Sequence, residues 1–178
     1  MENVILVDIL DNEIGTMPKM EAHLQGHLHR AFSIFIFNSN GELLLQQRAL
    51  DKYHSGGKWT NTCCSHPRLG EQTIDAANRR LKEEMGMNSK LQYGFNFIYN
   101  APLSDNLFEH EFDHVYFGVS DHAPKINKSE VADFKYISMQ ILTTDIKNNP
   151  HQYTEWLKIC FNRVLDSYQK ILKNEISY

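Results

Sequence analysis

The segment from Ala31 to Phe37 limits the fold most strongly, because it is a continuous run of mostly apolar residues with high β-propensity. Asn38-Ser39-Asn40-Gly41 follows it with residues that hairpin turns favour. Leu43 to Arg48 then begins with three leucines and reads as the returning strand. The three segments together predict a β-hairpin.

The other periodic segments predict more strands around one central helix. Ile74, Ala77, Leu81 and Met85 repeat at helical spacing and form one apolar face, with Thr73 as the expected N-terminal cap and Gly86 as the stop. Strands are predicted over 4–9, 91–99, 109–119 and 134–137, and residues 59–64 are expected to be extended. A long helix is predicted after Pro150. This order predicts an α+β fold of the α/β/α sandwich type.

Length and charge limit the classes of function. A chain of 178 residues is expected to form a single domain, residues 1–178, with one good core. A net charge of −4 provides no general attraction to nucleic acid, so an anionic ligand needs local cations or a metal. The first residues lack the basic start of a secretory signal, and no apolar run reaches membrane-spanning length. We therefore expect neither a nucleic-acid nor a membrane partner. The sequence leaves monomer and homodimer open.

The three cysteines point to a reducing compartment. Their number is odd and Cys63 and Cys64 are adjacent, so a disulfide framework is not expected and a cytoplasmic location fits. In an extended segment Cys64 and His66 project to one side and Cys63 to the other. Cys64 and His66 could form a nucleophile pair, as in cysteine hydrolases, or belong to an acid–base and metal site. Cys63 and Cys160 are interpreted as buried apolar residues.

Histidines are frequent, with nine in the chain. Most histidines in proteins are simply exposed or hydrogen-bonded, but five of these lie in the first 66 positions: His23, His27, His29, His54 and His66. Glu109 and Glu111 share one face of a predicted strand. Three imidazoles (His23, His29 and His66) with these two carboxylates would form a mixed nitrogen and oxygen site for zinc, manganese or another divalent ion.

A second charged group lies on the helix between Glu71 and Gly86, which carries glutamates and two arginines. Charged residues on a helix often form only its solvent-exposed face and bind nothing. The alternative is a magnesium–diphosphate site, in which carboxylates hold Mg²⁺ and arginines bind phosphate. Lys19, Arg48 and Lys52 could complete that pocket, although each alone would be an ordinary surface cation. Tyr99 and Trp156 could line a pocket or belong to the core.

Two motifs resemble a known family. Glu71, seven further residues and Arg79-Arg80-Leu81-Lys82-Glu83-Glu84-Met85-Gly86-Met87 resemble the Nudix box. Ser65 replaces its first glycine and Arg80 its first tail glutamate, which argues against hydrolysis of a nucleoside diphosphate derivative. The segments 61–67 and 28–33, with the Glu109-x-Glu111 pair, resemble the type 1 isopentenyl-diphosphate Δ-isomerases. The resemblance runs from about Lys19 to Trp156.

The resemblance implies a Nudix-like sandwich with a mixed sheet, and an enzyme that interconverts isopentenyl diphosphate and dimethylallyl diphosphate. Cys64 and Glu111 would move protons, with Tyr99 hydrogen-bonded beside Glu111 and Trp156 facing the isoprenoid. Mg²⁺ on the diphosphate would be held by Glu84. A second ion (Mn²⁺, Mg²⁺ or Zn²⁺) would be held by His23, His29, His66, Glu109 and Glu111, with His27 as an alternative ligand. The diphosphate would be surrounded by Lys19, Arg48, Lys52 and Arg80. A metal-stabilised binding domain without turnover is the non-catalytic alternative.

Overall fold

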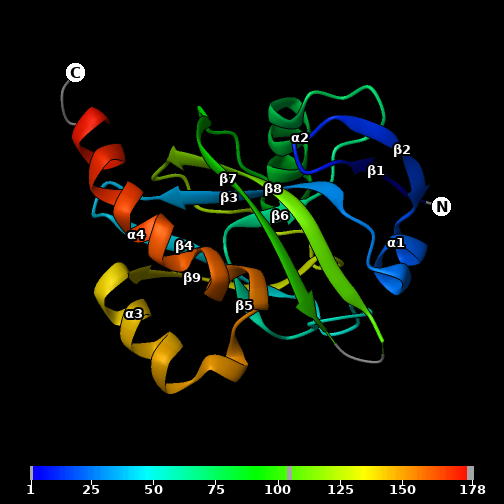
Figure 1. Ribbon diagram of the computed structural model, residues 1–178. Helices are drawn as coiled ribbons and strands as arrows, with labels where there is room; N and C mark the ends of the chain where they lie inside the picture. The colour runs from blue at the N-terminus through cyan, green and yellow to red at the C-terminus, as the bar shows by residue number, and fades with distance from the viewer. Residues whose placement is uncertain (1, 104–105, 176–178) are drawn as a thin grey trace.

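A computed structural model describes residues 2–103 and 106–175, and its nine strands join one sheet (Figure 1). The strands are β1 (Asn3–Val7), β2 (Glu13–Pro18), β3 (His29–Phe37), β4 (Glu42–Arg48), β5 (Trp59–Thr60), β6 (Cys63–Ser65), β7 (Gln92–Pro102), β8 (Phe108–Val119) and β9 (Val131–Ser138). The helices are α1 (Lys19–Gln25), α2 (Thr73–Met85), α3 (Met139–Asn148) and α4 (Glu155–Glu175), with a 3₁₀ turn at Pro150–Gln152.

The sheet is mixed, as the resemblance implies. Its main order is β2-β1-β3-β4-β5, and β3 also pairs with β6 and β8. The β3–β8 pairing is parallel, whereas β3 with β6, β7 with β8 and β4 with β9 are antiparallel. Strand β3 is therefore central, and it connects segments that lie far apart in the chain.

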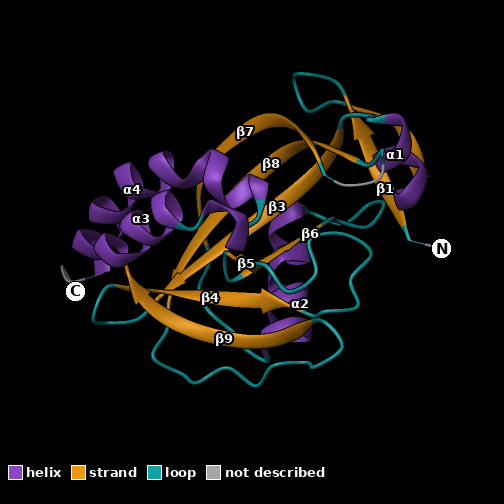
Figure 2. Cartoon of the chain, turned by 90° about the horizontal axis from the view of Figure 1, so that it is seen from below, coloured by secondary structure: helices purple, strands orange, loops and turns teal. Residues whose placement is uncertain are grey.

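Alternation along β3 creates the two core layers of the α/β/α sandwich. Phe32, Ile34 and Ile36 pack in the cluster that contains the buried face of α2. Phe35 and Phe37 pack in the opposite cluster, together with residues of α3 and α4. Figure 2 shows α2 on one side of the strands and α3 with α4 on the other. The expected hairpin and the expected sandwich are both confirmed.

Helix α2 matches its predicted bounds, but the predicted N-terminal cap was wrong. Gly86 ends the helix in the left-handed conformation, with φ of 63°, as a C-terminal glycine does. Thr73 does not cap the start, because the N-cap position falls on Gln72, whose side chain makes no capping hydrogen bond. Thr73 is already the first helical residue.

Three elements were not predicted: β2, α1 and α3. Strand β2 is largely exposed and therefore lacks the alternation that marks a half-buried strand. Helix α1 has seven residues, too few to be stable without tertiary contacts. For α3 the sequence does carry a signal, since the Ser138 hydroxyl accepts a hydrogen bond from the Ile141 backbone N–H at its start. In the described parts of the chain, no helix combines the length and apolar character that crossing a membrane would require.

Candidate active site

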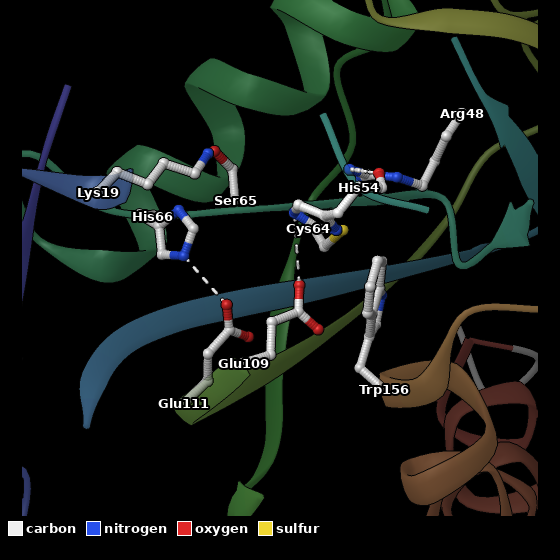
Figure 3. A pocket seen from close by; sticks show the side chains of 9 residues that line it. All are labelled: Lys19, Arg48, His54, Cys64, Ser65, His66, Glu109, Glu111 and Trp156. Atoms are coloured by element: carbon white, nitrogen blue, oxygen red, sulfur yellow. Dashed lines mark hydrogen bonds and ion pairs between the residues drawn. The ribbon is translucent and has the colours of Figure 1, made fainter. Parts of the chain in front are cut away.

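Pairing with β3 brings the predicted site residues together. His29 on β3 lies opposite Glu111 on β8, and Ser33 on β3 lies opposite Cys64 on β6. These strands direct Cys64 and Glu111 into a pocket that His66 and Trp156 also line (Figure 3). The complete lining is Lys19, Arg48, His54, Cys64, Ser65, His66, Glu109, Glu111 and Trp156.

Three of the predicted metal ligands form a buried imidazole cluster. The ring centroids are 5.0 Å apart for His23 and His29, 5.1 Å for His29 and His66, and 6.0 Å for His23 and His66. One donor atom from each of these rings and one oxygen of Glu111 all lie within 4.8 Å of one another. A set of donors this close matches the spacing of ligands around one ion.

Backbone carbonyls set the orientation of two of these rings. Nδ1 of His23 donates to the carbonyl oxygen of Lys19 at 2.7 Å, and Nδ1 of His29 donates to that of His27 at 2.8 Å. Each ring therefore keeps its Nε2 buried with no hydrogen-bond partner among the described residues. This arrangement is typical of metal-binding histidines. The ring of His27 is exposed and contacts Gln25, so His27 contributes its carbonyl and lies outside the cluster.

The carboxylates complete a set of donors that fits a divalent ion. His66 Nε2 lies 3.0 Å from Oε1 of Glu111, and the Tyr99 hydroxyl donates to Oε2 of Glu111 at 2.6 Å. Burial opposes ionisation of Glu111, but contacts with His29 and His66 prevail and hold its pKa well below the usual range. Burial and the charge of Glu111 raise the pKa of Glu109. A cation between the two glutamates would stabilise both as carboxylates.

The neutral imidazole of His66 also favours an ion at this position. Burial lowers the pKa of His66 to about 4, so its ring is neutral near pH 7 and a nitrogen lone pair is available. Imidazole donors suit transition-type ions, whereas Mg²⁺ prefers oxygen. The residues therefore fit a divalent ion.

Cys64 lies on the same side of the sheet as Trp156, whereas Cys63 is fully buried against α2. Cys64 packs with Tyr99, Ala101 and Trp156. Burial raises the pKa of the Cys64 thiol, and nearby carboxylates raise it further against the opposing charge of Arg48. The thiol is therefore protonated at neutral pH, as a group that gives up a proton must be at the start of the reaction. Because Nε2 of His66 is directed to Glu111, the geometry does not favour a cysteine-hydrolase pair.

Trp156 forms the apolar wall of the pocket and is held by a hydrogen bond. Its side chain is buried, and its indole N–H donates to Oδ1 of Asn61 at 3.0 Å. The Arg48 guanidinium carbon lies 5.3 Å from the ring centroid. The indole face is therefore already in contact with a positive charge, an interaction that aromatic rings favour.

The predicted diphosphate residues lie at an adjoining end of the site. Glu84 is buried and accepts hydrogen bonds from Arg80 at 2.6 Å and from Gln46 at 3.0 Å. Lys52 and Arg80 both contact Glu130, the latter at 3.4 Å. Lys19 pairs with Glu2 at 3.3 Å. The connected parts of the site are lined by Lys19, Arg48, Lys52, Arg80, Glu84 and Glu130.

Three residues of the site have no role assigned by the sequence patterns. His54, Asn61 and Glu130 each contact a predicted site residue, although no motif identified their roles. His54 had one usable signal, its membership of the histidine-rich first third of the chain. Glu130 is an isolated acid in a polar segment, so only its tertiary contacts distinguish it from an ordinary surface residue.

Comparison with solved structures supports the architecture. A Deinococcus radiodurans protein, DR0079, has a TM-score of 0.68 at 20% identity, over 83% of this chain and 90% of its own. A MutT protein from Methanosarcina mazei Go1 has a TM-score of 0.60 at 15% identity, over 85% and 96%. At such identities the likeness concerns the fold alone.

Sequence comparisons are more specific. The NUDIX domain family model matches residues 27–157. A protein of Aromatoleum aromaticum named isopentenyl-diphosphate Delta-isomerase 2 is 51% identical over 92% of this chain and 87% of its own. An isopentenyl-diphosphate Delta-isomerase of Pectobacterium atrosepticum is 50% identical over 95% and 94%. The chain therefore belongs to the isopentenyl-diphosphate Delta-isomerase family, built on the NUDIX domain.

Proposed function

We propose that this protein interconverts isopentenyl diphosphate and dimethylallyl diphosphate, with Cys64 and Glu111 as the groups that move protons. The observation that carries the assignment of these residues is the pairing of a protonated thiol with a carboxylate of lowered pKa in one pocket. Moving a double bond by one carbon needs one group of each kind.

The reaction balances with these two residues. The Cys64 thiol gives its proton to the terminal methylene carbon, whose π electrons form the new C–H bond and leave a tertiary carbocation. The Glu111 carboxylate then removes a proton from the carbon on the other side of the cation, and that C–H pair becomes the new double bond. Return of the proton from Glu111 to the thiolate restores the starting state, and the reverse reaction uses the same steps in reverse.

Trp156 and Tyr99 support the charges that develop. The indole would stabilise the carbocation by about 2 kcal/mol in a dry pocket. This is a small part of the roughly 8–23 kcal/mol that enzymes supply, so positioning and exclusion of water must provide most of the effect. The Tyr99 hydroxyl, 2.6 Å from Glu111, orients the carboxylate toward its substrate carbon.

The charged ends of the site would hold the substrate and two ions. Glu84 would hold Mg²⁺ on the diphosphate, with the cations Lys19, Arg48, Lys52 and Arg80 around it. The diphosphate binding energy would hold a small apolar tail over the proton-moving groups. His23, His29, His66, Glu109 and Glu111 would hold a second ion, Mn²⁺, Zn²⁺ or Mg²⁺, whose positive charge tunes the basicity of the glutamates.

Incubation of the protein with isopentenyl diphosphate and Mg²⁺ tests the activity, with the dimethylallyl isomer as the product measured. Cys64→Ala should lower turnover by about 10²–10⁴-fold, the range for loss of a positioned acid or base. Cys63→Ala is the matched control, because Cys63 packs in the α2 core cluster and has no exposed surface. Its variant should lose some stability and keep turnover.

Three outcomes would contradict the proposal. Near-normal turnover by folded Cys64→Ala would remove the thiol from the mechanism. Phosphate release from nucleoside diphosphate derivatives, without isomerisation, would indicate a hydrolase. Metal binding without any turnover would indicate the non-catalytic alternative.

A further inference from the structure

We propose that His54 is a further donor to the ion at the His23, His29, His66, Glu109 and Glu111 site, which makes it a six-residue site. His54 lies in the loop between β4 and β5, and its side chain is buried at 6% exposure. The inference goes beyond the isomerase reaction and depends only on the metal site.

The distances place His54 beside two of the other donors, Glu109 and His23. Its Nε2 lies 3.8 Å from Oε1 of Glu109, and its ring centroid lies 5.8 Å from that of His23. The latter value falls within the 5.0–6.0 Å that separates the rings of His23, His29 and His66. Figure 3 shows the ring of His54 above Glu109, with the dashed line joining the two.

The candidate donors form two groups that share one residue. The first contains His23, His29, His66 and Glu111, and the second contains His23, His54 and Glu109. In each group the donor atoms lie within 4.8 Å of one another. Two groups could indicate two ions or two parts of one site.

His23 decides between these alternatives. Its Nδ1 carries the proton donated to the Lys19 carbonyl, so the ring has one free lone pair, on the buried Nε2. One lone pair binds one ion. The two groups therefore describe a single site, in which Glu109 and His54 approach the ion from the side of the β4–β5 loop.

The surroundings of His54 keep its ring at this position. The ring meets Tyr53 edge-on at 4.4 Å and Trp156 at 6.3 Å, and the Arg48 guanidinium donates to the His54 backbone carbonyl at 3.3 Å. Its Nδ1 is buried with no hydrogen-bond partner in the described parts of the chain. A polar ring buried in this way, 3.8 Å from a carboxylate, has the position of a ligand rather than of an ordinary packing residue.

The test distinguishes whether His54 donates to the ion or only packs as an aromatic ring. His54→Phe keeps the ring contacts with Tyr53 and Trp156 and removes both nitrogens. His27→Phe is the matched control, because His27 is exposed and lies outside the cluster. Each protein is stripped of metal and titrated with Co²⁺ against a competing chelator. The absorption spectrum of bound Co²⁺ and the bound metal per chain are recorded.

We expect one Co²⁺ per chain in the parent protein, binding weakened about tenfold or more in His54→Phe, and a changed spectrum. His27→Phe should match the parent. Equal melting of the two metal-free variants shows that His54→Phe is folded; if it is not, His54→Ala is measured in its place. Parental affinity and spectrum in the His54 variant would overturn the inference, as would two ions per chain or no binding by the parent. The titration uses no isoprenoid, so its result does not depend on whether the isomerase proposal holds.

Discussion

Replacing Trp156 by phenylalanine separates the proposed catalytic role of this residue from a purely structural one. The indole is buried at 2% exposure and packs against Tyr99, Cys64 and Ala101. Phenylalanine retains an aromatic face in the pocket, but that face is smaller and binds cations more weakly. The variant also lacks the indole N–H that donates to Asn61.

The structure sets the size of both effects. Oδ1 of Asn61 keeps a second donor, the Thr60 hydroxyl at 2.8 Å, so no buried acceptor is left unpaired. The lost hydrogen bond and the smaller ring should together cost about 1–2 kcal/mol, less than the 3–5 kcal/mol of truncation to alanine. In a domain of this size that lowers Tm by roughly 2–8 °C. Weaker stabilisation of the carbocation by about 1–2 kcal/mol would lower kcat by about 5- to 30-fold.

Turnover of isopentenyl diphosphate and thermal melting should be measured on the same preparations. Tyr153→Phe is the matched control, because it also removes a buried aromatic donor, here to Asp145, on the α3–α4 side of the core. It should melt lower and keep kcat. If Trp156→Phe kept full kcat while Trp156→Leu melted far lower, Trp156 would be a core residue, and Tyr99 would become the first candidate for stabilising the cation.

Three further changes test other parts of the site. Tyr99→Phe removes a donor to Glu111, which should raise the pKa of that carboxyl and move the acid limb of the kcat/KM profile to higher pH; an unchanged profile would contradict this role. Metal-free protein should lose stability as pH falls from 6.5 to 4, because the unfolded chain protonates His66 in this range and the folded chain does not. The pKa of about 4 corresponds to a loss of order 3 kcal/mol in the free energy of unfolding. In His66→Asn, the free energy measured by urea unfolding should therefore fall less steeply with decreasing pH. Glu84→Gln should raise the Mg²⁺ concentration for half-maximal turnover about tenfold, with melting little changed, since Arg80 still contacts Glu83 and Glu130; an unchanged Mg²⁺ requirement would remove Glu84 from the magnesium site.

Local patterns in the sequence determined the main elements of the sheet and α2. The apolar run in β3 and the alternation in β8 depend on the side-chain period of a strand, which is a local property. The same period places Glu109, Glu111 and Asp113 on one face of β8, where all three are buried. The expectation that Cys64 and Cys63 face opposite sides of β6 also held, since one packs with Trp156 and the other with α2.

The tertiary structure alone decided how these elements form one site. Parallel pairing sets His29 opposite Glu111, and sequence spacing carries no information about pairing between distant strands. Backbone carbonyls leave Nε2 of His23 and His29 free, and they separate His27 from the cluster. A loop without a periodic pattern brings His54 to Glu109. Ligand sets and proton-transfer pairs depend on distances of a few ångströms between segments far apart in the chain, and only the packed fold specifies those distances.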